Sequence, residues 1–196
     1  MKELKSERRL QKITKIVNSR QFTLRVVLEN IHDPHNVSAI FRTCDAVGIP
    51  KVSLIYYLEK FPKIGKKSSA SAFKWVEKEK FSSVSECFES LKKDGFTIYT
   101  STISDDAIDL YKLNFKKKIA IVLGNEHRGV SNEAAKLADK KFKIPMFGMV
   151  QSLNVSVAAA IVLYEALRQR KKKSYYEKSE LNKSDMEELI EKWSRK

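Results

Sequence analysis

Short apolar runs rich in β-branched and aromatic residues recur along the chain, and most are separated by a helical pattern. The runs are LRVVLEN (24–30), VSLIYYL (52–58), FTIYTS (96–101), KIAIVLG (118–124) and FKIP (142–145). Residues of this kind favour buried strands. Strands that alternate with helices predict an α/β fold with a mostly parallel sheet and helices on both faces.

The segment between the first two runs predicts a well-defined helix. Asp33 is a good N-cap, Pro34 suits the first helical position, and Gly48 followed by Pro50 ends the pattern. The apolar positions fall on one face at the helical period, namely Val37, Ile40, Phe41, Cys44, Val47 and Gly48. Arg42 lies about 160° from the centre of that face at about 100° per residue. It therefore points at solvent, at a ligand or at a partner.

Three segments that lie far apart each join a loop to a helix and carry polar side chains that an apolar scaffold does not need. They are NIHDPHNVSAIFRTCDAVG (30–48), IVLGNEHRGVS (121–131) and IPMFGMVQSLNVSVAAA (144–160). In order and in spacing they resemble the three motifs of the SpoU branch of the SPOUT methyltransferases, which methylate a ribose 2′-hydroxyl of RNA. The resemblance covers about residues 22–167 and implies a C-terminal trefoil knot, which periodicity alone would never suggest.

The resemblance also implies a catalytic group, made of Arg42, Asn36, Glu126, Ser152 and Asn154. Without it, Arg42 and Asn36 would be an ordinary surface arginine and a capping-region amide, and Glu126 a turn residue. A guanidinium stays protonated at any ordinary pH, so we expect Arg42 to position an RNA phosphate and stabilise the developing oxyanion. The neighbouring phosphate or water would take the proton. The family's proposal that the arginine is a phosphate-activated base stays open.

The implied cofactor is S-adenosylmethionine, held by loops. Its expected contacts are Leu123, Gly124, Asn125, Glu126, Ile144, Met149, Ser152, Leu153 and Asn154. The chain has neither G-x-G-x-x-G nor a P-loop, which argues against a dinucleotide site, a P-loop nucleotidase and the Rossmann-type methyltransferases. His32, Asp33 and His35 with His127 suggest a metal site only weakly, since two of them flank a helix cap and methyl transfer needs no metal. We expect none.

The net charge of +14 is concentrated in residues 1–20, 60–80 and 168–196, and the rest of the chain is neutral overall. This distribution predicts a catalytic body with basic segments that grip phosphates, although solvated helix faces would give the same composition. We expect a basic helical extension (1–20), a methyltransferase domain (21–167), a second basic helical extension (168–196), and a loop over residues 60–73. Ser184 and Glu187 form a capping-box signal for a last helix, expected to pack on the first one. The expected RNA contacts are Arg8, Arg9, Arg20, His35, Arg168, Arg170, Lys171 and Lys172.

Basic extensions at both ends are typical of family members that methylate a guanosine in the D loop of tRNA. A wobble-position enzyme would lack them, and ribosomal RNA enzymes of the family usually carry a separate amino-terminal domain. Both stay alternatives, as does a non-catalytic RNA-binding module, against which Arg42 and Asn154 argue. A flavodoxin-like enzyme acting on a free nucleotide would leave the basic ends unexplained.

Residues 153–167 are apolar almost all round, which predicts cover by the fold, by a second subunit, or by both. We expect a homodimer whose active site lies near the interface, with Arg42 of one subunit serving the pocket of the other.

No apolar stretch is long enough to span a bilayer and no leader follows Met1, so we expect a cytoplasmic protein that does not contact membranes. Cys44 and Cys87 lie in unrelated segments and suggest neither a disulfide framework nor a zinc site.

Overall fold

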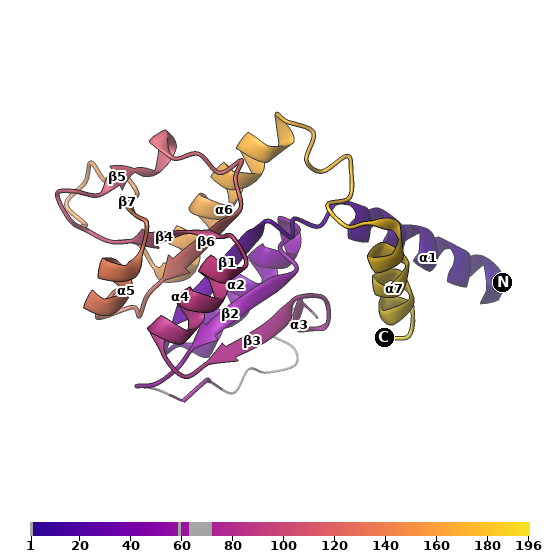
Figure 1. The fold of residues 1–196 in the computed structure, drawn as a ribbon, viewed down its shortest axis with the longest axis horizontal. Helices are drawn as coiled ribbons and strands as arrows, with labels where there is room; N and C mark the ends of the chain where they lie inside the picture. The colour runs from indigo at the N-terminus through magenta and orange to yellow at the C-terminus, as the bar shows by residue number, and fades with distance from the viewer. Residues whose placement is uncertain (1, 59, 63–71) are drawn as a thin grey trace.

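The computed structural model describes residues 2–58, 60–62 and 72–196 of the chain (Figure 1). Most of the loop expected over residues 60–73 lies outside the described residues. Seven strands form one sheet in the order β3-β2-β1-β6-β4-β7-β5, and each paired neighbour runs parallel. The strands are β1 (Leu24–Glu29), β2 (Lys51–Ile55), β3 (Glu77–Phe81), β4 (Thr97–Ser101), β5 (Ile108–Asp109), β6 (Ile119–Leu123) and β7 (Lys140–Lys143). The expected parallel α/β sheet is confirmed.

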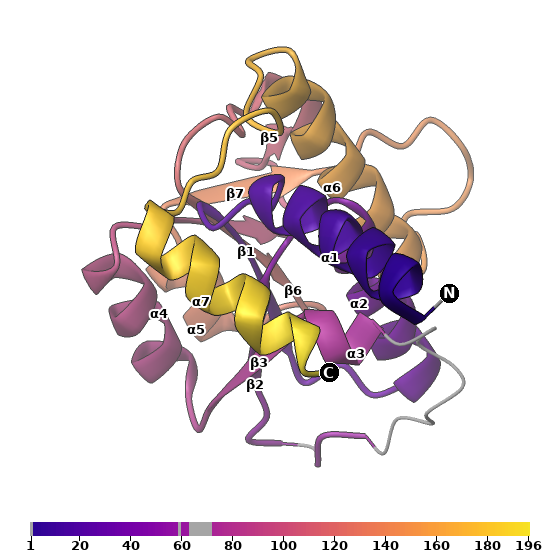
Figure 2. The same ribbon diagram turned by 90° about the vertical axis from the view of Figure 1, so that its right-hand side faces the viewer.

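The two faces of the sheet bury different helices, because side chains alternate along each strand. Val26 and Leu28 of β1 belong to the core on the face that α2 and α6 cover, whereas Val27 belongs to the core beneath α4 and α5. Figures 1 and 2 show helices on both sides of the sheet. The helices are α1 (Lys2–Asn18), α2 (Pro34–Ala46), α3 (Ala72–Trp75), α4 (Val84–Lys93), α5 (Asn132–Leu137), α6 (Val155–Lys171) and α7 (Lys183–Ser194), with a 3-10 turn at Leu110–Lys112.

Strand β2 is shorter than its apolar run. Tyr57 and Leu58 leave the sheet because both backbone N–H groups donate to Asn30 Oδ1, each at 3.2 Å. Strand β3 was not expected, because its sequence EKEKF is an edge strand without a buried apolar face. In both cases a local contact or an edge position decides the structure, and neither leaves a periodic signal.

The first and last helices pack on each other as expected (Figure 2). Ile13, Val17 and Trp193 form a small separate core between them, and the Trp193 ring lies 4.9 Å from that of Trp75. The expected capping box of Ser184 is wrong: Asn182 caps α7, its side chain accepting from Asp185 N at 2.9 Å. Helix α6 extends to Lys171, four residues past the expected domain end at 167, because its basic last turn continues the helix beyond the apolar stretch.

Candidate active site

The first and third motif segments follow β1 and β7, the second begins within β6, and their loops meet at the carboxyl edge of the sheet. Open parallel sheets bind ligands at this edge, because the loops there are free to vary while the strands hold their ends in place. The α2 helix begins as expected: the Asp33 side chain accepts from His35 N at 2.8 Å, and Pro34 occupies the first turn. This fixes Asn36 in the first turn of α2.

A chain of hydrogen bonds joins the three motifs. Asn36 Nδ2 of the first motif donates to Glu126 Oε1 of the second at 2.9 Å. Asn154 Nδ2 of the third motif donates to Asn36 Oδ1 at 3.0 Å. Asn154 Oδ1 accepts from Ser156 N at 2.9 Å and so caps α6. Three residues from segments about 30 to 120 positions apart thus form one connected junction, as expected for a single site.

Glu126 is held as a carboxylate. It accepts from His32 N at 3.0 Å and from Asp33 N at 3.2 Å, besides Asn36. Burial alone would raise the pKa of Glu126, but the hydrogen bonds from Asn36, His32 N and Asp33 N together bring its pKa below the ordinary value. The second motif is therefore bound to the loop that starts α2.

Two residues at the end of β1 bind the second motif, and the sequence analysis did not single them out. Asn30 O accepts from Asn125 Nδ2 at 2.7 Å, and Glu29 accepts from Ser131 N at 3.0 Å and from the Tyr57 hydroxyl at 3.0 Å. Asn30 adopts a φ of 50°, which an asparagine tolerates better than most residues. The sequence signal that could have identified them is an acidic residue followed by an amide at the end of a buried strand.

A cavity of about 620 Å³ opens beside the junction. The expected cofactor residues that line it are Leu123, Gly124, Asn125, Glu126, Ile144, Ser152, Leu153 and Asn154. Gly124 is required there, because a Cβ would lie 2.2 Å from the backbone of Gly129 and Val130. Met149 is the exception among the expected contacts: it does not line the cavity and is 99% exposed, since its loop points into solvent in the single chain. Met146 lines the cavity instead. The trefoil knot that the family resemblance implies for this region stays a prediction.

Arg42 is exposed on α2, as its helical phase predicts. The exposed positions of α2 are His35, Ala39, Arg42 and Ala46, which share one side of the helix. Alanine on either side leaves room around the guanidinium. Arg42 has no hydrogen bond or ion pair within the described part of the chain, and it does not line the cavity of its own chain.

The expected RNA contacts divide into two groups. Six are exposed and accessible to a partner, namely Arg8, Arg9, His35, Arg168, Lys171 and Lys172. Arg20 and Arg170 are fully buried, so the expectation that they contact RNA is wrong for this structure. Composition could not separate the two groups, because a buried arginine with internal partners and an exposed one contribute the same charge.

Within the described residues, no group of three His, Cys, Asp or Glu side chains is arranged to hold a metal ion. Nor does that part of the chain contain a helix with the length and apolar content needed to cross a membrane.

The fold and the site define a class: a parallel α/β protein with a loop-built pocket at the carboxyl edge of its sheet and an exposed arginine on the helix after the first strand. Residues 23–164 match the model of the SpoU rRNA Methylase family, and the chain belongs to this family.

Relatives extend the likeness to both ends of the chain. It is 43% identical over 192 residues to the tRNA (guanosine(18)-2′-O)-methyltransferase of Thermus thermophilus, covering 98% of each chain. The enzyme of the same name from Aquifex aeolicus is 38% identical, over 99% of this chain and 92% of its own. The crystal structure of the A. aeolicus TrmH/SpoU tRNA modifying enzyme superposes with a TM-score of 0.91 at 38% identity, covering 97% and 96% of the two chains. AviRb of Streptomyces viridochromogenes in complex with AdoMet, 24% identical with a TM-score of 0.70 over 79% and 62% of the chains, shares the fold.

Proposed function

We propose that this protein transfers a methyl group from S-adenosylmethionine to the ribose 2′-hydroxyl of guanosine 18 in the D loop of tRNA, acting in the cytoplasm. The observation that carries the proposal is the junction of Glu126, Asn36 and Asn154, which brings the three family motifs together beside a cavity. Relatives named for this reaction match nearly the whole chain, terminal extensions included.

The cavity fits the cofactor in size and in chemistry. A volume of about 620 Å³ is within the usual range of small-molecule sites. Leu123, Ile144 and Leu153 line the cavity and offer apolar side chains to an adenine ring, and residues 124–130 line it as well and carry backbone groups able to bind the polar edge of that ring. When bound, S-adenosylmethionine supplies a methyl group on a positively charged sulfur.

Arg42 is the residue of this chain suited to act on the RNA. A guanidinium offers five N–H donors in a rigid fork, which matches a phosphate bidentately. Bound to the phosphate next to the target, Arg42 orients the ribose and stabilises negative charge on the 2′ oxygen as its proton leaves. That proton would pass to the phosphate or to water, and the bound cofactor would supply the methyl group that the 2′ oxygen accepts.

The active unit in this proposal is a homodimer. The loop before α6 and the outer side of α6 expose large apolar residues, which are Phe147, Met149, Val150, Val157 and Tyr164. An exposed apolar patch of this kind marks an interaction surface. A two-fold dimer through this surface would cover it and bring a second copy beside the cavity. Because Arg42 does not line its own cavity, we assign it to the pocket of the partner subunit.

The test is to incubate the protein with labelled S-adenosylmethionine and unmodified total tRNA, and then to map the methylated nucleotide. We expect label on the ribose of guanosine 18. Label on a base would overturn the reaction, and label on another ribose would overturn the assignment of the target.

A further inference from the structure

Arg170, near the end of α6, is a buried hub that joins three segments. Its guanidinium donates to Phe115 O at 2.9 Å and to Lys117 O at 2.7 Å, in the loop before β6. It also donates to Thr23 O at 3.0 Å and to Thr23 Oγ1 at 2.8 Å, in the segment that joins α1 to β1. Glu180, on the approach to α7, accepts from Thr23 N at 2.8 Å and lies 3.5 Å from the same guanidinium. The two ends of the chain therefore meet at Arg170.

Arg20 is a second buried arginine, and it joins the carboxyl end of α2 to α7. It donates to Ile49 O at 3.1 Å and to Asp45 Oδ1 at 2.5 Å, at the carboxyl end of that helix. Its guanidinium carbon lies 5.0 Å from the centre of the Trp193 ring of α7. One buried arginine thus holds the end of α2 and the last helix together.

Two further hydrogen bonds join these segments to the turn that follows α2. Gln21 N donates to Gly48 O at 2.8 Å, and the Tyr176 hydroxyl donates to Val47 O at 2.9 Å. Burial raises the pKa of Tyr176 to about 12, so its hydroxyl stays protonated at neutral pH and keeps donating this bond. We call Arg20, Gln21, Thr23, Arg170, Tyr176 and Glu180 the brace, and the helix pair α1 and α7 the arm.

The helices that the brace holds are those that carry the active-site residues. Helix α2 starts at the junction with Asn36 and ends at the brace with Asp45, and Arg42 lies three residues before Asp45, about 4.5 Å along the helix axis. Helix α6 starts at the junction with its cap Asn154 and reaches the brace with Arg170. The two helices pack side by side between these ends.

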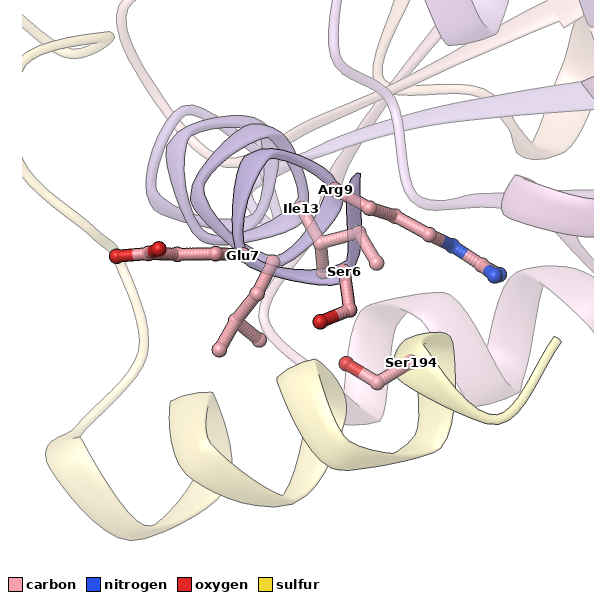
Figure 3. Close-up of a pocket in the computed structure, with 6 residues that line it drawn as sticks. Ser6, Glu7, Arg9, Ile13 and Ser194 are labelled. Carbon is pink, nitrogen blue, oxygen red and sulfur yellow. The ribbon is translucent and has the colours of Figure 1, made fainter. Parts of the chain in front are cut away.

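The arm presents exposed basic residues and, in the described part of the chain, attaches to the sheet outside the brace at one place, where Trp193 packs on Trp75 and Lys192 donates to Glu77 Oε1 at 2.7 Å. Figure 3 shows Ser6 and Ser194 pointing toward each other across the gap between α1 and α7, with Glu7 and Arg9 directed to opposite sides. Its buried core contains Ile13, Val17 and Trp193, which is small for two helices. The direction in which Arg8 and Arg9 face therefore depends on what fixes the arm to the rest of the chain.

We propose that Arg20 and Arg170 are positioning residues: through the brace they lock the arm to the carboxyl ends of α2 and α6, so that RNA held by the arm keeps a fixed register with Arg42. This inference rests on the proposed tRNA substrate. It assigns the two buried arginines an action through the arm, without contact to RNA. Such coupling is physical because α2 is one continuous helix from Asn36 to Asp45.

The test uses Arg170→Lys in the full-length protein. Lysine keeps the charge but lacks the planar fork, so it cannot reach Phe115 O, Lys117 O and Thr23 together. We expect faster hydrogen exchange in α1 and α7 with protection of the sheet retained. We also expect tRNA binding about ten-fold weaker, the equivalent of 1.4 kcal/mol, and a lower kcat, with unchanged affinity for S-adenosylmethionine. In a double-mutant cycle, Arg9→Ala should weaken tRNA binding less once Arg170 is replaced, because the two act through one arm.

Gln169→Ala is the matched control. Gln169 is the neighbouring residue on α6, and its hydrogen bonds within the described residues go to Leu113 O, Phe115 N and Glu165 Oε1, not to residues 18–23 or to the arm. This variant should lose stability while exchange in the arm and the effect of Arg9→Ala stay as in the unaltered protein. If Arg170→Lys does not fold, Tyr176→Phe removes one bond of the brace and should change exchange and tRNA binding in the same direction.

An arm that exchanges as slowly in a folded Arg170→Lys or Tyr176→Phe protein as in the unaltered one would refute the brace. Additive effects of Arg170→Lys and Arg9→Ala would do the same. Failure of the unaltered protein to methylate tRNA would instead count against the proposed function, and the exchange measurement would still judge the brace.

Discussion

Arg42 differs from the buried arginines of this chain in having no partner within the described residues. Because its side chain is exposed and lines no part of its own cavity, Arg42→Ala should leave the fold and cofactor binding intact. Loss of one preorganised donor to a developing oxyanion lowers turnover by about 100-fold to 1,000-fold. Turnover on tRNA and calorimetry with S-adenosylmethionine measure the two effects separately. An equal loss of both would make Arg42 a structural residue.

Glu126 gives a second prediction at the same scale, because all its described partners donate to it. Glu126→Gln puts an amide group among donors from His32, Asp33 and Asn36, and should destabilise the protein by about 1 to 3 kcal/mol at neutral pH. The folded pKa of Glu126 lies below its ordinary value, so its contribution is complete above the unfolded pKa of about 4.3 and is lost as the pH falls through the folded value.

Melting temperatures of the Glu126→Gln and unaltered proteins, compared from pH 7 down to pH 3, check this dependence. The gap between the two should be widest near neutrality and should narrow in acid. A gap of constant size would show that the charge of Glu126 is not what its hydrogen-bond donors stabilise.

At the scale of the elements, helix α6 owes its start to Asn154, and this cap is also part of the junction. Asn154→Ala should lower stability by about 1 kcal/mol, the usual value for an N-cap, and should also weaken cofactor binding because Asn36 loses a partner. Ser83→Ala is the matched control, since Ser83 caps α4 through Glu86 N at 3.1 Å, and α4 packs on the other face of the sheet. Equal cofactor affinity in the two variants would contradict a role for Asn154 beyond capping.

The elements also show which parts of the fold the sequence predicts. Helix α2 follows from its caps and its apolar face, and strands β1, β4 and β6 follow from continuous apolar runs, because β1 and β6 are buried throughout and β4 at its three central residues. Strand β3 was missed, because an edge strand of alternating charges satisfies no burial pattern. At α7 the expected cap was two residues late: Asn182 and Ser184 are both good caps, and only the turn before the helix selects between them.

The site divides in the same way. Asn36, Glu126 and Asn154 were expected as a group because the motifs mark them, and their hydrogen bonds join them. Glu29 and Asn30 were missed, because their roles depend on Ser131 and Asn125, about 100 residues away in sequence. The buried state of Arg20 and Arg170 was missed for a related reason: the charge of a basic segment does not reveal which of its arginines has internal partners.

At the scale of the whole molecule, the brace that holds the arm and the cavity lie at opposite ends of the strands. The brace holds residues 47–49 and 115–117, which precede β2 and β6, whereas the cavity is built by loops that follow β6 and β7. A strand of five residues spans about 17 Å at the usual rise per residue. In the proposed complex, RNA bound by the arm would therefore extend along the molecule, past the exposed side of α2, to reach a pocket.

The last prediction concerns which subunit's pocket Arg42 serves. If Arg42 of one subunit serves the cavity that contains Asn154 of the other, a mixed dimer of Arg42→Ala and Asn154→Ala chains has one pocket with both residues and one with neither. Activity should then return to about half that of the unaltered dimer, because a two-fold dimer has two equivalent sites. If each chain is self-contained, both pockets are defective and mixing restores nothing. Turnover of mixed dimers purified through two different tags measures the difference, with each parent homodimer as the reference. Inactive mixed dimers of verified composition would rule out the shared site and return Arg42 to the pocket of its own chain.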